Sequence, residues 1–420
     1  MAKPLDVLIV GGGIGGQTLA LALHAAGLPC RIRIHEAAPT LMPLGVGINL
    51  QPHAIRELAG LGLLDTLRRV GIEAREFAYF THHGQLVFRE PSGLFAGYAF
   101  PHFSIHRGEL LMVLCGATRE RLGADSIVTG QRCVAVEQDD SGVTARFVDQ
   151  KGKPLPAQRA DIVVACDGIH SAIRKQFYPD EGSPVFHGIN LWRGLTRMKP
   201  FLTGASVTRV GGLYTTGKLV VYPIRNDIDG EGNQLLNWNT EIVTDRLAPV
   251  DWNAPGKLED FFPIYKDWTF DWLDCAGMIR SAEMLLTYPM VDRDPVSRWT
   301  FGRVTLLGDA AHPMYPRGGN GGAQAIIDAT SLAGLLKSHA DPAAALQKYE
   351  TLRLSPTSRI VLENRTAPPD IIIDTVERLT GGQRFDDLSR FISQDELKRL
   401  TQSYYRIAGS DLDSVGRKES

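Results

Sequence analysis

The stretch LDVLIVGGGIGGQTLALALHAAGLPCRIRIHE, residues 5–36, has the order of a β-turn-α-β unit. Its apolar start, Leu5 to Val10, is short, β-branched and ended by glycine, which predicts a buried strand rather than a helix. Gly11, Gly13 and Gly16 then have the G-x-G-x-x-G spacing, and a helix and a second strand follow. This combination is typical of a dinucleotide-binding site.

Each part of the motif has a physical role at a phosphate site. Gly11 permits the tight turn, Gly13 lets the backbone approach a pyrophosphate, and Gly16 lets the helix pack close to the strand. The helix that begins near Gly15 directs free N–H groups at the phosphates. Glu36 lies where an acid accepts hydrogen bonds from an adenosine ribose, which favours FAD or NAD over NADP. The motif alone does not choose between FAD and NAD, and a purely conformational glycine turn is the alternative.

The composition argues for a small-molecule partner. The 420 residues are 44% hydrophobic and 22% charged, which is ordinary for a soluble globular enzyme of two or three domains. A formal net charge of −2 gives no reason to expect nucleic acid or an anionic membrane as a partner. No apolar run approaches the roughly 18 residues that a membrane helix needs.

Cysteines and histidines predict neither a disulfide framework nor a metal site. The five cysteines are an odd number and widely spaced, as expected of reduced thiols in a cytoplasmic protein. His106 and His312 are expected to be packed loop histidines, and we predict no metal. The cysteines are Cys30, Cys115, Cys133, Cys166 and Cys275.

Two later motifs place chemistry at strand ends. The apolar run 160–166 is followed by Asp167 and a short helix with Arg174. Another apolar run ends at Asp309, and GGNGG at 318–322 opens a helix. Ligands of open α/β sheets lie beyond the carboxyl ends of the strands, so Asp309 is expected at the site. The glycine-rich helix start offers N–H groups to a second anionic centre.

Residues 186–289 read as a different kind of structure. LWRGLTRM, KLVVYPI, QLLNWNTEI and MLLTYPM are separated by polar and glycine-rich turns, which predicts a mostly antiparallel sheet rich in aromatic residues. Such a sheet suits a wall over a flat apolar ligand, although a place in the hydrophobic core is the alternative for each residue. The candidates for this wall are Trp192, Tyr222, Trp238, Met290, Pro313, Met314 and Tyr315.

Three motifs in this order, GGGIGG with Glu36, CDGIHSAIR with Asp167, and GDAAHPMYPRGGNGGAQ with Asp309, resemble the flavoprotein aromatic hydroxylases of the para-hydroxybenzoate hydroxylase type. The resemblance covers residues 4–365. Within that group, GVGINLQPHAIRELAGLGL, FSIHRGEL and YPMVDRDP are most similar to the phenazine-carboxylate hydroxylases, of the 5-methylphenazine-1-carboxylate 1-monooxygenase kind.

The resemblance implies FAD as the resident cofactor, and it implies where the adenosine half binds. The pyrophosphate would lie at the turn of Gly11, Gly13, Ile14, Gly15 and Gly16, with the ribose on Glu36. Val134 would contact the adenine through its backbone. From the residues alone, Arg107 at a helix start has either an anionic partner or a surface salt bridge. The resemblance implies that Arg107 reaches the ribityl-phosphate region.

For the flavin half, the resemblance implies that Val46 and Gly47 lie near the isoalloxazine ring. Asp309 would hold ribityl or pyrophosphate oxygens. The flavin N1 and C2 carbonyl edge would be faced by Gly319, Asn320, Gly321 and Gly322. Asp167 belongs to a motif associated with both FAD and the nicotinamide coenzyme. Many relatives have Gly-Gln-Gly before the asparagine, whereas Arg317-Gly318-Gly319 stands here, which puts flavin mobility and reactivity in doubt.

The implied reaction is hydroxylation of an aromatic or heteroaromatic small molecule by FAD, NADH or NADPH, and O₂, through a flavin C4a-hydroperoxide. A second G-x-G-x-x-G is absent from the sequence, so the nicotinamide coenzyme would visit transiently. The flavin would carry the chemistry, and we predict no catalytic side chain. The alternatives are a flavin dehydrogenase or oxidase without oxygen insertion, and a non-catalytic flavin-binding protein. Arg193 or Arg317 could hold a substrate carboxylate, or either could be an ion-paired surface group.

The predicted fold class is α/β: a Rossmann-like FAD-binding domain with an inserted, mostly antiparallel substrate domain and a C-terminal helical segment. We assign residues 1–77, 104–185 and 290–365 to the FAD-binding domain. Residues 78–103 and 186–289 form the predicted substrate-binding domain, and 366–420 a helical tail with a mobile polar end. Either a monomer or a homodimer fits the sequence.

Overall fold

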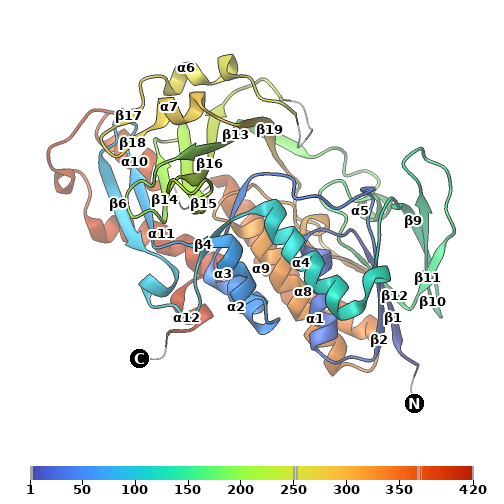
Figure 1. Cartoon of the computed structure of the whole chain (residues 1–420). Coiled ribbons are helices and arrows are strands. Elements are labelled where there is room, and N and C mark those ends of the chain that lie inside the picture. The colour runs from blue at the N-terminus through green and yellow to red at the C-terminus, as the bar shows by residue number, and fades with distance from the viewer. Residues whose placement is uncertain (1–2, 249–250, 252–253, 367–368, 370, 419–420) are drawn as a thin grey trace.

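A six-stranded sheet that includes the first strand of the chain lies in one half of the molecule, on the right in Figure 1. The computed structural model describes residues 3–248, 251, 254–366, 369 and 371–418. The strand order is β20-β21-β12-β1-β2-β8, and β1 pairs in parallel with both β2 and β12. The strands are β1 (Leu5–Val10), β2 (Cys30–His35), β8 (Ile127–Val128), β12 (Ile162–Ala165), β20 (Thr300–Phe301) and β21 (Val304–Leu306).

The order of these strands fixes where a ligand can bind. The chain runs from β1 to β2 and β8 on one side, and the later β12 and β21 lie on the other side. The strand order therefore reverses beside β1, and crevices outside the carboxyl ends of parallel strands occur at such a switch point. Helix α1 packs against both α4 and α8, and α9 packs on α8. These helices are α1 (Ile14–Ala25), α4 (Arg107–Leu122), α8 (Asn320–Ser338) and α9 (Pro342–Thr366).

Two three-stranded sheets flank this core. One, in the order β11-β10-β9, is an antiparallel hairpin of β9 and β10 around residues 139–142, extended by a third strand. The other, in the order β3-β7-β4, joins three short segments that are far apart in the sequence. Its strands have only three or four residues, too few to show an alternating pattern. The elements are β3 (Gly47–Leu50), β4 (Gly71–Glu73), β7 (Phe103–His106), β9 (Arg132–Asp139), β10 (Gly142–Val148), β11 (Gln158–Ala160), α2 (Pro52–Gly60), α3 (Leu64–Val70) and α5 (Ala172–Phe177).

A seven-stranded sheet lies in the other half of the molecule, at the upper left in Figure 1. Its order is β19-β13-β16-β15-β14-β5-β6, and all its pairings are antiparallel except β14 with β5. A Rossmann-like sheet combined with mainly antiparallel sheets and C-terminal helices confirms the predicted fold class. The strands are β5 (Glu76–Phe80), β6 (Leu86–Pro91), β13 (Val185–Met198), β14 (Ser206–Val210), β15 (Lys218–Arg225), β16 (Gln234–Val243) and β19 (Met284–Asp292).

The two faces of this sheet have different coverings. On one face, here called the outer face, Trp192 and Trp238 pack in a core with Phe261 and Met278. The outer face is covered by α6 (Phe262–Tyr265), β17 (Thr269–Phe270), β18 (Leu273–Asp274) and α7 (Cys275–Arg280). The opposite, inner face is shared, because the C-terminal helices cover its β14-β5-β6 end. These helices are α10 (Ile371–Leu379) and α11 (Gln394–Ala408), whereas α12 (Leu412–Val415) packs against α2.

The C-terminal segment is fixed by hydrogen bonds, so the expectation of a mobile polar end is wrong for the described residues. Gly416 accepts a backbone hydrogen bond from Ala99 (3.1 Å), and Lys418 donates one to Gly97 (2.9 Å). On α10, the carboxylate of Glu377 accepts from the backbone N–H of His82 (3.0 Å) and from the hydroxyl of Thr216 (3.0 Å). These bonds, with those from Thr215 and the His82 ring, outweigh the desolvation and lower the pKa of Glu377 from 4.5 to about 2.

We expect Glu377→Gln to lower the unfolding free energy at pH 7 by about 3 kcal/mol, the value of a pKa difference of roughly two units. Because the folded-state pKa is depressed, this stabilisation is present above pH 4.5 and is lost as the pH falls toward 2. Urea unfolding at pH 7 and pH 3 checks this, with exposed Glu259→Gln as the control. A difference from wild type that is equally large at both pH values would contradict the assignment.

Candidate functional site

The turn after β1 is tightly packed at two glycines and open at a third. Gly11 has φ +104°, and a Cβ there would overlap the carbonyl group of Cys166. A Cβ on Gly16 would overlap the carbonyl oxygen of Gly11, so α1 begins directly against the turn. A Cβ on Gly13, in contrast, would meet no atom within 4 Å. The backbone at Gly13 thus faces open space, as a close approach to phosphate requires.

Glu36 ties the end of β2 to this turn. Its Oε2 accepts a hydrogen bond from the N–H of Gly12 (2.7 Å), and its Oε1 accepts one from the N–H of Ala38 (2.7 Å). An ionised carboxylate has about four acceptor positions. The half-buried Glu36 can therefore still accept hydrogen bonds from ribose hydroxyls.

Asp167 follows β12 at the same edge of the sheet. Its Oδ2 accepts a hydrogen bond from the N–H of Ala172 (2.9 Å), while its buried Oδ1 has no hydrogen-bond partner among the described residues. Burial raises the pKa of this carboxyl. Burial and the Asp167 charge together raise the pKa of the Cys133 thiol to about 12, which places exposed Val134 of β9 in the same neighbourhood. A ligand hydroxyl would satisfy the partnerless oxygen.

Asp309 follows β21 at the carboxyl edge of the six-stranded sheet. Its side chain is solvent-exposed, yet enough protein surrounds it that burial raises the pKa of its carboxyl. The charges of His312 and of Arg107, at the start of α4, act in the opposite direction. Exposure combined with desolvation is expected of a group that faces an internal space. The structure thus brings Asp309 and Arg107 to the same internal space, here called the cleft, although they are 202 positions apart in the sequence.

The start of α8 meets the start of α1 and β3 at this cleft. A Cβ on Gly322 would lie 3.0 Å from Ile48 Cδ1 and 4.0 Å from Ile14 Cδ1, and one on Gly321 would lie 3.9 Å from Asp309 Oδ1. No side chain among the described residues caps the first N–H groups of α8. Uncapped N–H groups and the positive end of a 19-residue helix suit an anionic or carbonyl-bearing ligand edge.

The inner face of the seven-stranded sheet closes the cleft. The N–H of Gly47 donates to Asn237 Oδ1 (2.7 Å), and a Cβ on Gly47 would lie 2.8 Å from Tyr222. Tyr222 pairs across the strands with Asn237, and Val46 packs in the same core cluster as Tyr222. The absence of a side chain at Gly47 therefore allows β3 to lie against the sheet.

Arg193 lies on this inner face, opposite Asn239 of β16. Its guanidinium carbon is 5.9 Å from the centre of the Tyr288 ring. Burial, followed by the charge of Arg107, lowers the pKa of Arg193 to about 10. Two cations near each other in a poorly solvated place favour an anionic group beside them.

Arg317 has a different environment. It is buried, it donates from Nη1 to the carbonyl oxygen of Asn364 (3.0 Å), and it lies 3.7 Å from Glu241 Oε2. Glu241 also pairs with Lys218 (2.7 Å). Arg317 is thus built into a protein ion-pair network, and of the two arginines only Arg193 is retained as a carboxylate candidate.

The predicted wall residues separate by sheet face. Met290 and Tyr315 share a cluster with Leu191, which is on the inner face, and Pro313 and Met314 precede the loop at α8. Trp192 and Trp238 point to the outer face, because side chains alternate along a strand. Trp238 is fully buried, and its Nε1 donates to Thr196 Oγ1 (2.9 Å). The packing therefore favours the core alternative for both tryptophans, and we do not keep them as wall candidates.

Sequence reasoning missed Asn237 and Tyr288. The available signal was alternation: Asn237 stands between Leu236 and Trp238 and must face opposite to them. Which face meets the cleft is decided by contacts between segments about 190 residues apart, such as Gly47 with Asn237.

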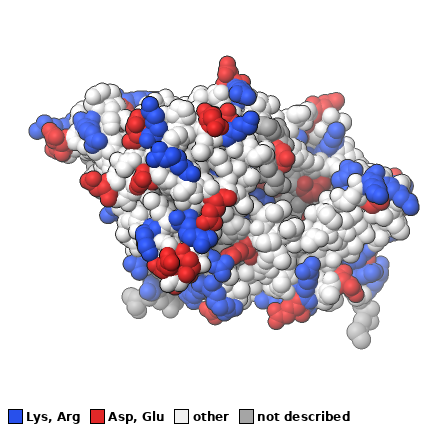
Figure 2. Space-filling view, turned by 45° about the horizontal axis from the view of Figure 1, so that its top comes forward, with Lys and Arg blue, Asp and Glu red and all other residues white. Residues whose placement is uncertain are grey.

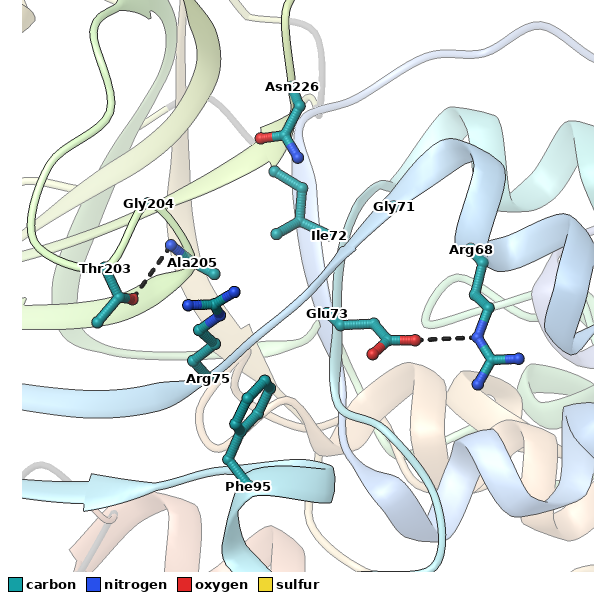
Figure 3. Close-up of a pocket in the computed structure, with 10 residues that line it drawn as sticks. All are labelled: Arg68, Gly71, Ile72, Glu73, Arg75, Phe95, Thr203, Gly204, Ala205 and Asn226. Carbon is teal, nitrogen blue, oxygen red and sulfur yellow. Dashed lines mark hydrogen bonds and ion pairs between the residues drawn. The ribbon is translucent and has the colours of Figure 1, made fainter.

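Other surface features lie apart from this cleft. Acidic and basic side chains are interspersed over the face shown in Figure 2. A groove of about 490 Å³ lies between β4 and the loop at 203–205 (Figure 3). In it, Arg68 Nε donates to Glu73 (3.0 Å), and Arg75 lies 5.4 Å above the Phe95 ring. No sequence-predicted site residue lines this groove.

Comparison with known proteins identifies the fold and its chemistry. A family model described as FAD binding domain matches residues 4–190 and 283–363. Phenazine 1,6-dicarboxylic acid hydroxylase PhzS of Lysobacter antibioticus is 43% identical over 381 residues, which are 90% of this chain and 92% of that protein. The chain belongs to the FAD-dependent aromatic hydroxylases.

More distant members agree with this assignment. The 3-hydroxybenzoate 6-hydroxylase of Polaromonas naphthalenivorans is 30% identical, covering 89% of this chain and 90% of that protein. A crystal structure of Klebsiella pneumoniae HpxO complexed with FAD and uric acid has a TM-score of 0.70 at 24% identity, covering 98% of this chain and 96% of that one. At this level of sequence identity, the similarity to the HpxO structure shows a shared fold only.

The hydroxylase is an FAD-dependent monooxygenase acting on an aromatic or heteroaromatic compound, so the predicted family, reaction class and cofactor are confirmed. Within the described residues, no helix is long and apolar enough to cross a membrane. The same part of the chain contains no group of three or more His, Cys, Asp or Glu residues suited to a metal ion.

Two glycine substitutions should separate folding from cofactor binding. Gly13→Ala introduces a Cβ into open space, so we expect a thermal unfolding temperature of the apoprotein close to wild type but at least tenfold weaker FAD binding. Gly16→Ala overlaps backbone, so we expect it to destabilise the apoprotein itself by about 2 kcal/mol or more. Differential scanning fluorimetry and FAD titration measure both. A Gly13→Ala protein that retains wild-type FAD affinity would refute the position of the pyrophosphate.

Proposed function

We propose that this hydroxylase acts on a planar aromatic or heteroaromatic carboxylic acid and uses NADH or NADPH as the reductant. The observation that carries the proposal is Arg193, on the inner face beside Tyr288 and within electrostatic reach of Arg107. The names of relatives support the substrate class. They include a phenazine 1,6-dicarboxylic acid hydroxylase at 43% identity and a 3-amino-4-hydroxybenzoate 2-monooxygenase at 34%.

For the cofactor, we propose that the adenosine half of FAD lies against Glu36 and the backbone at Val134. The pyrophosphate would lie at the turn of Gly11 to Gly16, and the ribityl chain would lie near Arg107, Asp167 and Asp309. The partnerless Asp167 Oδ1 and the open space at Gly13 support this path. The isoalloxazine would then reach Val46, Gly47 and the loop Gly319 to Gly322.

Bound FAD would supply the oxygen chemistry, in which one atom of O₂ enters the aromatic ring and the other is reduced to water with electrons from the coenzyme. The side chains of this protein would bind, orient and exclude water. The uncapped N–H groups at the start of α8 would stabilise negative charge at the flavin edge. Met290, Pro313, Met314 and Tyr315 would keep water from the reacting centre.

A cavity of about 740 Å³ beside α5 is our proposed approach for the coenzyme. It adjoins the Asp167 motif, and exposed His170 and Lys175 are among its lining residues. The ammonium group of Lys175 and the ring N–H of His170 suit the oxygens of a pyrophosphate. The five cysteines are free thiols, which together with the need for NAD(P)H supports a cytoplasmic location.

The direct test is to purify the protein with FAD and to supply NADH or NADPH with phenazine 1,6-dicarboxylic acid, 3-hydroxybenzoate and their amides. We expect an acid to stimulate coenzyme oxidation and to yield a product one oxygen atom heavier, detected by mass spectrometry. Oxidation that yields only hydrogen peroxide with every acid, but a hydroxylated product with a neutral compound, would contradict the proposed substrate class.

Replacement of the proposed carboxylate ligand should discriminate acid from amide. Arg193→Gln removes hydrogen bonds to a charged group, each contributing about 1.5–3 kcal/mol, so we expect KM for the acid to rise at least tenfold. KM for the amide should change much less. Arg197→Gln is the control, because Arg197 is on the same strand but half-exposed and paired with Glu283. Equal effects of Arg193→Gln on acid and amide would argue against a carboxylate contact.

A further inference from the structure

Helix α11 touches the first two turns of α8 at two points with matched spacing. Asn320 Nδ2 donates to the hydroxyl oxygen of Tyr404 (2.8 Å). Four residues later on both helices, Gln324 Nε2 donates to the carbonyl oxygen of Ala408 (3.2 Å). Residues four apart lie on the same face of a helix, so the two contacts fix both the position and the rotation of α8.

The Tyr404 hydroxyl is the centre of a buried network. It donates to Asn364 Oδ1 on α9 (2.5 Å) while it accepts from Asn320. The side chain is 1% exposed. The backbone oxygen of Asn364 also accepts a hydrogen bond from Arg317 Nη1 (3.0 Å). The hydroxyl therefore joins α9, α11 and the start of α8 in an enclosed place, where a lost partner is costly.

The same hydroxyl explains the departure from the usual glycine-rich sequence. Gly318 and Gly319 both have left-handed φ values, +62° and +70°, and a Cβ on Gly318 would overlap the Tyr404 hydroxyl. On its other side, the carbonyl oxygen of Gly318 accepts from Gln51 Nε2 (2.6 Å). The loop before α8 is therefore held between α2 and α11.

We propose that Tyr404 is a positioning residue for the flavin. By holding Asn320, it keeps the N–H groups of Gly321 and Gly322 directed at the isoalloxazine edge. This inference rests on the proposed placement of that edge at α8. Helix α11 lies outside residues 4–190 and 283–363, which the FAD-binding family model matches. The C-terminal segment thus contributes to the flavin environment without contacting the flavin.

The test compares flavin properties of the holoenzyme in four variants. Tyr404→Phe keeps the ring and removes the hydroxyl, and Asn364→Ser weakens the same network from α9, should Tyr404→Phe fold poorly. Tyr405→Phe is the control on the same helix: Tyr405 is half-buried, and its hydroxyl donates to Glu90 (2.7 Å), away from the loop. Gly321→Ala tests the placement of the flavin edge itself, because its Cβ would meet nothing closer than 3.9 Å in the protein.

We expect Tyr404→Phe and Asn364→Ser to weaken FAD binding by about threefold to tenfold, the effect of a perturbed hydrogen bond of about 1 kcal/mol. The flavin absorption band should shift, and the flavin midpoint potential should fall because the reduced anion is less stabilised. Tyr405→Phe should lower the unfolding temperature to a similar degree and leave affinity, spectrum and potential as in wild type. Gly321→Ala should change all three flavin properties in a protein as stable as wild type.

Two outcomes overturn the inference in distinguishable ways. If Gly321→Ala changes the flavin properties and the two network variants leave them unchanged, Tyr404 has only a structural role. If Gly321→Ala also leaves them unchanged, the flavin edge does not lie at α8, and the proposed cofactor placement fails with the inference. If Tyr404→Phe and Tyr405→Phe change the flavin properties equally, the changes come from lower protein stability and not from the Tyr404 hydroxyl, which also overturns the inference.

Discussion

The backbone contact between the turn after β1 and the end of β12 is the constraint on which the site depends. Gly11 lies against the Cys166 carbonyl, and Gly16 lies against Gly11. Because no side chain separates these segments, the ends of β1 and β12 and the start of α1 converge at the switch point of the sheet. Glu36, Asp167 and the loop after β21 follow from that convergence, since each comes directly after a neighbouring parallel strand.

The substrate half depends on how one sheet divides its two faces. Alternation sends Trp192 and Trp238 into the outer core and leaves Arg193, Asn237 and Tyr222 on the inner face. The outer face is a conventional hydrophobic core that makes the sheet rigid. The inner face is more polar along β13 and β16, because it meets the FAD-binding half of the molecule and, beyond it, the C-terminal helices. We therefore expect substrate specificity to come from the polar residues of the inner face, which contribute less to protein stability than the apolar residues of the outer face.

The sequence predicted those parts of the site that depend on local backbone chemistry. The glycine turn, Glu36, Asp167 and Asp309 were recognisable because each is tied to a strand end within a few residues. The face that Trp192 and Trp238 occupy was not predictable, since strand alternation gives two equivalent answers until a tertiary contact such as Gly47 with Asn237 selects one. The sequence also did not predict the strands β3 and β4 or the docking of residues 410–418, because these segments are stabilised by partners that are distant in the sequence.

The start of α8 shows why a segment beyond the recognised motifs is needed. A helix start that must direct its N–H groups at a ligand cannot use a side-chain cap, and Gly319 at the N-cap of α8 provides none. Asn320, the first residue of the helix, turns inward and donates to Tyr404. The start of α8 is therefore stabilised through its contacts with α9 and α11, and its first N–H groups remain available to a ligand. Because that helix end has no side-chain cap, the loop before α8 depends on α11 of the C-terminal segment for its support.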